Sequence, residues 1–110
     1  MSISQAISVF FNNNTSVRYT ATSPAGQKMR FKFRYIYDTS ASSWRAYIVK
    51  SPDYGYKATD LHATHRYYDE SRRMYYICWT QPLSKYADIV EISEVWARET
   101  AKYIETGERF

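Results

Sequence analysis

The chain has 110 residues, a formal net charge of +4, 12 tyrosines and one cysteine, and this length is expected to form a single domain, residues 1–110, without disulfides or metal ions. Its only cysteine, Cys78, excludes a disulfide within the chain, and neither a basic-then-apolar leader nor an apolar run of membrane-spanning length is present. We therefore expect a soluble cytoplasmic protein that has no contact with a membrane.

The first part of the chain predicts a short N-terminal helix followed by a β-hairpin. Apolar residues recur at helical spacing from Ser2 to Phe11, and the three asparagines at 12–14 end this pattern. Residues 17–22 alternate well enough for a first strand. The sequence Ser-Pro-Ala-Gly at 23–26 is typical of a turn, so a second strand is expected to fold back on the first.

The second strand has the clearest pattern in the chain. Apolar and aromatic residues at 29, 31, 33, 35 and 37 alternate with Arg30, Lys32, Arg34 and Ile36. Successive side chains of a strand point to opposite faces of the sheet. One face is therefore expected to be apolar and the other cationic.

The third strand begins near Trp44, after a loop of small polar residues, and ends at Lys50-Ser51-Pro52. If Trp44 faces the core, the same alternation places Arg45 and Tyr47 on the cationic face. The candidate binding site is this face, and Arg18 of the first strand is a further candidate. Its predicted members are Arg30, Lys32, Arg34, Arg45 and Tyr47.

Residues 53–64 predict a polar loop with room for one helical turn around 59–62. A second hairpin follows, with strands at 65–68 and 73–80 and a turn through Asp69–Arg72. Both faces of the strand at 73–80 are largely apolar, which is typical of a central strand covered on both sides. The pattern leaves open which of these faces contacts a helix.

The segment from Pro82 to Gly107 predicts one long amphipathic helix, at about 84–106. Ser84 is the expected N-cap, and Gly107 suits the left-handed residue after the last turn. An apolar stripe this wide has to be buried against a flat partner. We therefore expect an α+β fold in which an antiparallel sheet of four or five strands packs against this helix. The apolar half of the helix consists of Ile89, Val90, Ile92, Trp96, Ala97, Ala101, Tyr103 and Ile104, with Val95 alone on the polar side.

Positive charge is concentrated in the first half of the chain. Residues 1–57 hold eight basic and two acidic residues, a net charge of +6, whereas residues 58–110 hold seven basic and nine acidic residues, a net charge of −2. Cations that follow phosphates and flat rings on which bases stack are what single-stranded nucleic acid requires. The predicted order of elements, several antiparallel strands followed by a covering helix, also resembles the order in some folds that bind single-stranded nucleic acid. The leading hypothesis is a non-catalytic module that binds DNA or RNA; alternatively, the charges keep the sheet soluble.

The tyrosine-rich strands suggest a second hypothesis. Tyrosine, tryptophan and arginine are the residue types that anchor protein interfaces. The chain would then be a protein-interaction or self-associating module, for example a homodimer, unless these rings fill an aromatic core. The candidate interface residues are Tyr54, Tyr56, Tyr67, Tyr68, Tyr75 and Trp79.

The sequence contains no motif that indicates an enzyme, a metal site or a cofactor. Asp60, His62 and His65 are potential ligands, but they lack a familiar zinc spacing, and Cys78 lies among apolar residues, where a thiol usually behaves as a small hydrophobic group. The glutamates of the predicted helix lie on its polar side, where solvated carboxylates are expected. We therefore expect no catalytic residue, no metal and no cofactor.

Overall fold

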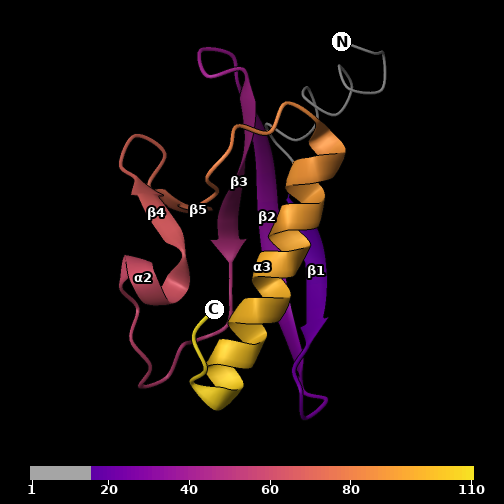
Figure 1. Cartoon of the computed structure of the whole chain (residues 1–110), viewed down its shortest axis with the longest axis vertical. Helices are drawn as coiled ribbons and strands as arrows, with labels where there is room; N and C mark the ends of the chain where they lie inside the picture. The colour runs from indigo at the N-terminus through magenta and orange to yellow at the C-terminus, as the bar shows by residue number, and fades with distance from the viewer. Residues whose placement is uncertain (1–15) are drawn as a thin grey trace.

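The structure, a computed structural model, describes residues 16–110 and has the predicted α+β architecture (Figure 1). A five-stranded antiparallel sheet has the strand order β1-β2-β3-β5-β4, and the long C-terminal helix α3 packs against it. The elements are β1 (Val17–Thr22), β2 (Lys28–Asp38), β3 (Ser43–Lys50), α2 (Leu61–Thr64), β4 (Arg66–Asp69), β5 (Met74–Ile77) and α3 (Tyr86–Thr106). The short helix α2 lies in mid-chain, whereas the predicted helix from Ser2 to Phe11 falls outside the described residues.

The turns of the three hairpins within residues 16–110 contain residue types that favour turns: glycine in the first and aspartate with serine in the other two. Between β1 and β2, Gly26 donates its N–H to the carbonyl of Ser23 at 2.9 Å and adopts a φ of +89°, which favours glycine. This confirms the predicted turn at 23–26. Between β2 and β3, the side chain of Asp38 accepts the N–H of Ser40 at 3.0 Å, and the turn between β4 and β5 repeats this Asp-x-Ser arrangement.

The core lies between α3 and the strands β1, β2 and β3. Phe31 and Phe33 meet Trp96 edge to face, with ring centroids 5.8 and 6.0 Å apart. Ala97 and Ala101 are fully buried, and their small side chains let the helix approach the sheet closely. In Figure 1, α3 crosses in front of β1 and β2, whereas α2, β4 and β5 lie beside it.

The ends of α3 confirm one predicted cap and correct the other. Gly107 adopts a φ of +77° and donates its N–H to the carbonyl of Tyr103 at 2.7 Å, as expected for the residue after the last turn. The helix begins at Tyr86, so the prediction of Ser84 as the N-cap was wrong. Lys85 occupies that position, with φ −104° and ψ 133°, and makes no side-chain capping bond.

The second hairpin is shorter and less covered than predicted. Strand β5 ends at Ile77 and is paired on both sides, with β3 and β4; Ile77 is buried in the core cluster that contains Trp96 of α3, whereas Tyr75 is 38% exposed. Tyr75 pairs with Ile48, which places Tyr75 and Ile77 on the side of the sheet that carries α3. The helical turn forms at 61–64, where the carbonyl of Thr64 accepts a hydrogen bond of 2.9 Å from Trp96 Nε1. No helix within residues 16–110 is long and apolar enough to cross a membrane.

Candidate functional site

All five predicted site residues lie on the sheet face that points away from α3. Phe33 packs on Trp96 of α3, so the flanking residues of β2 must point to the other side. Arg34 pairs with Tyr47, and Ile36 pairs with Arg45. Because paired residues lie on the same face of a sheet, Tyr47 and Arg45 of β3 also point away from α3. We call this side of the sheet the cationic face. Its charged members are Arg18, Arg30, Lys32, Arg34, Arg45 and Lys50.

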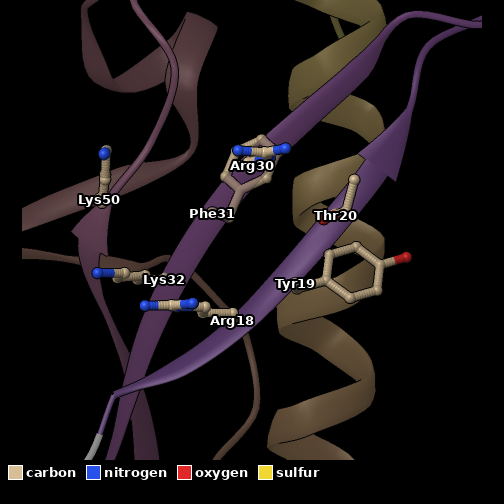
Figure 2. A pocket seen from close by; sticks show the side chains of 7 residues that line it. All are labelled: Arg18, Tyr19, Thr20, Arg30, Phe31, Lys32 and Lys50. Carbon is tan, nitrogen blue, oxygen red and sulfur yellow. The ribbon is translucent and has the colours of Figure 1, made fainter.

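Three of these cations are direct cross-strand neighbours. Arg18 of β1 pairs with Lys32 of β2, and Lys32 pairs with Lys50 of β3. We call this trio the cationic row. Together with Arg30 it lines a hollow of about 540 Å³, and Figure 2 shows these side chains on the near side of the strands with α3 behind them.

The cationic row lacks a neutralising partner within the described part of the chain. The ion pairs of residues 16–110 join Arg45 with Asp69 at 3.7 Å and Lys102 with Glu108 at 3.4 Å. Like charges directly opposite each other in a sheet destabilise it. Repulsion within the row therefore destabilises the free protein, and a bound anion would reduce this repulsion.

Lys50 was not among the predicted site residues, and a β-bulge explains why. Strict alternation from Trp44 would place position 50 on the same side as the core. The register shifts between the pairs Lys32–Lys50 and Phe33–Ile48, so β3 contains one extra residue at Val49. A bulge of this kind turns the following side chain to the other face. The alternating pattern of the sequence contains no sign of it.

Beside the cationic row, three tyrosines stand in register across β3, β5 and β4. Tyr47 pairs with Tyr76, and Tyr76 pairs with Tyr67, with ring centroids 5.6 and 5.8 Å apart. We call this set the tyrosine ladder. Exposure rises along it, because Tyr47 is 2% exposed, Tyr76 is half-buried and Tyr67 at the sheet edge is 47% exposed.

A polar network fixes the inner end of the ladder. The Tyr47 hydroxyl donates to Asp69 Oδ2 at 2.7 Å, and Arg45 Nη1 donates to the same hydroxyl at 3.3 Å. The guanidinium of Arg45 also lies 4.4 Å from the ring centroid of Tyr76. Hydrogen bonds from Tyr47 and then from Ser71 lower the pKa of Asp69 to about 2, so this carboxylate is ionised at neutral pH.

Comparisons with protein-family models, with curated proteins and with solved structures found no match. The function is therefore argued from the geometry of this chain.

The aromatic residues predicted as an interface divide into exposed and buried ones. Tyr54 is only 7% exposed, and Arg66 lies 5.2 Å from its ring centroid, so Tyr54 belongs to a small core cluster with Ala63 and Tyr103. The remaining members of the predicted set are exposed. They are Tyr56, Tyr67, Tyr68, Tyr75 and Trp79.

The surroundings of the two histidines and of Cys78 do not form a metal site within the described residues. His65 Nε2 lies 2.5 Å from the carbonyl oxygen of Phe110, and the two rings lie tilted against each other with centroids 4.4 Å apart, whereas His62 is exposed. Burial raises the pKa of Cys78 to about 11, so its thiol stays protonated at neutral pH. Residues 16–110 contain no group of three or more histidine, cysteine or acidic side chains that could hold a metal ion.

Proposed function

We propose that the chain is a non-catalytic module that binds nucleic acid through the cationic face. The observation that supports this most directly is the cationic row, in which Arg18, Lys32 and Lys50 oppose one another across three strands. A phosphate backbone presents closely spaced negative charges. Contact with it would turn the mutual repulsion of the row into attraction and would release condensed counterions.

The shape of the face also favours a polymeric anion. The cations project from three neighbouring strands around a shallow hollow, and they do not converge on one point as ligands of a single small anion do. An extended chain of phosphates can contact all of them at once. We place this activity in the cytoplasm, the compartment expected from the single cysteine.

The test is a fluorescence anisotropy titration with labelled single-stranded and duplex oligonucleotides between about 50 and 200 mM salt. The logarithm of the affinity should fall linearly with the logarithm of the salt concentration. Lys32→Gln removes the central charge of the row. We expect it to weaken binding to all sequences and to reduce the salt slope by roughly 0.7 to 1.

Lys85→Gln is the matched control, because it removes one exposed lysine at the N-terminal end of α3, away from the cationic face. It should leave affinity and salt slope unchanged. Lys32→Gln should keep or raise the free energy of unfolding, since it relieves repulsion with Arg18 and Lys50. Failure of the wild-type protein to bind either oligonucleotide at low salt would refute the proposed function.

A competing function is self-association through the aromatic surface that α3 leaves uncovered. Tyr68 and Tyr75 pair with ring centroids 4.9 Å apart on the α3 side of the sheet, and Trp79 is 52% exposed beside Val95. Exposed apolar clusters of this kind commonly mark interfaces. This function predicts a dimer in light scattering that Trp79→Ser dissociates, and a strictly monomeric wild-type protein would exclude it.

A further inference from the structure

The cationic row and the tyrosine ladder meet at β3 on one face: the row runs over β1, β2 and β3, and the ladder runs over β3, β5 and β4. Lys32 and Arg34 are alternate residues of β2, and Arg34 is in register with Tyr47 at the start of the ladder. Two residues along a strand correspond to about 7 Å. A strand of nucleic acid that crosses the sheet from β1 to β4 can therefore contact the row with its phosphates first and the ladder with its bases farther along.

The ladder is rigid at its inner end and accessible at its outer end. Tyr47 is held by Asp69 and is buried, so its ring supports Tyr76 and offers no free surface of its own. Tyr67 lies on the edge strand β4, where one side of its ring is in solvent. A ring that is already fixed loses little conformational entropy when a ligand stacks on it.

Arg45 adds a second flat group to the same surface. Its guanidinium lies over the Tyr76 ring at 4.4 Å, and its side chain remains 37% exposed. Guanidinium planes, like aromatic rings, are surfaces on which unpaired bases stack. Tyr67 and the Arg45 guanidinium that covers Tyr76 are therefore the flat groups on which bases can stack.

We propose that the nucleic acid bound by this face is single-stranded and that its bases stack on Tyr67 and on the Arg45 guanidinium that lies over Tyr76. This inference rests on the proposed function. In a duplex the bases are stacked on each other and present only their edges, whereas unpaired bases offer the flat faces that a tyrosine ring can contact. Stacking accepts any base, so the module should show little sequence preference.

The test compares three labelled ligands of equal length: oligothymidylate, an abasic oligomer with the same number of phosphates, and a duplex. Oligothymidylate should bind about 5- to 150-fold more tightly than the abasic oligomer for each base that stacks. Tyr67→Leu should remove about that factor for oligothymidylate and leave the abasic affinity and the salt slope unchanged. Tyr67→Phe, which keeps the ring, should retain the wild-type affinity.

Tyr56→Leu is the control, because Tyr56 is a fully exposed tyrosine outside the ladder, and it should bind like the wild type. Equal affinity of the wild-type protein for the oligothymidylate and the abasic oligomer would overturn base stacking and leave the proposed function intact. Tighter binding of the duplex would also overturn the inference. Binding of none of the three would instead refute the proposed function. The ligand comparison uses the wild-type chain, so it decides the inference even if Tyr67→Leu does not fold.

Discussion

One hydrogen-bonded pair of hydroxyls connects the sheet with α3 inside the core. Tyr35 and Ser93 are both fully buried, and their hydroxyl oxygens lie 2.6 Å apart. Ser93 also donates to the carbonyl of Val90 at 2.7 Å, so the Tyr35 hydroxyl is the donor in the pair. Ser93→Ala would leave that donor buried without a partner, which costs roughly 1 to 3 kcal/mol. We expect this loss in the free energy of unfolding, measured by urea denaturation.

The partner substitution should be milder. Tyr35→Phe leaves Ser93 bonded to Val90, so its expected cost is about 0.5 to 1.5 kcal/mol. The double variant Tyr35→Phe/Ser93→Ala should be less destabilised than the sum of the two, because no buried hydroxyl is then left unpaired. Strict additivity would show that the hydrogen bond contributes nothing.

At the scale of an element, α3 begins without a side-chain cap. Lys85 already has the extended backbone of an N-cap residue, but its side chain cannot accept the free N–H groups of the first turn. Lys85→Asp would supply an acceptor and a negative charge at the positive end of the helix dipole. We expect thermal and urea denaturation to show stabilisation by about 1 kcal/mol. Ser84→Ala should change nothing, and a loss of stability there would show that Ser84 is the cap after all.

The amphipathic pattern was sufficient to predict α3, because a helix of this length repeats its apolar residues over many turns. It also placed Val95 on the exposed side, where the structure has it. The N-cap was mispredicted because Ser84 and Lys85 differ by one position, and backbone geometry decides which of them starts the helix. Ser93 and Thr100 are buried although they are polar; the hydroxyl of Ser93 is hydrogen-bonded to the carbonyl of Val90, whereas that of Thr100 has no partner within the described residues.

The candidate site was predictable in part. Alternation within β2 and β3 was enough to place Arg30, Lys32 and Arg45 on one face, because the period of a strand is fixed by its backbone. Which residues face each other across strands depends on register, and the bulge at Val49 that sets the pairing of Lys50 leaves no sign in the alternating pattern. The pairing of Lys50 with Lys32 and of Tyr67 with Tyr76 therefore emerged only from the fold.

At the scale of the whole molecule, the two sides of the sheet have different roles. The side under α3 holds the core, and α3 packs mainly on β1, β2 and β3. The other side carries the cationic row and the tyrosine ladder, of which Tyr47 is buried and Tyr67 is exposed. Substitutions such as Lys32→Gln and Tyr67→Leu should therefore separate binding from stability, whereas Trp96→Ala should cost about 3 to 5 kcal/mol of stability.

Buried tyrosines make the molecule as a whole sensitive to alkali. Burial raises the pKa of Tyr35 from 10.0 to about 12, and burial also raises the pKa of Tyr47 and of Tyr54. A group with a raised pKa in the folded state holds its proton more tightly there than in the unfolded chain. Its contribution to stability is therefore complete below pH 10 and is lost as the pH rises towards 12.

For Tyr35 alone, the rise from 10.0 to about 12 corresponds to a stability change on the order of 2 to 3 kcal/mol. Urea denaturation at a series of pH values from about 9 to 12 should show the free energy of unfolding falling above pH 10. The absorbance of tyrosinate from the buried tyrosines should rise only above pH 10, at the same pH at which the near-ultraviolet circular dichroism is lost. Tyr35→Phe should flatten this decline, because its ring cannot ionise. A fold that stays intact while every tyrosine titrates near 10 would contradict the burial of these hydroxyls.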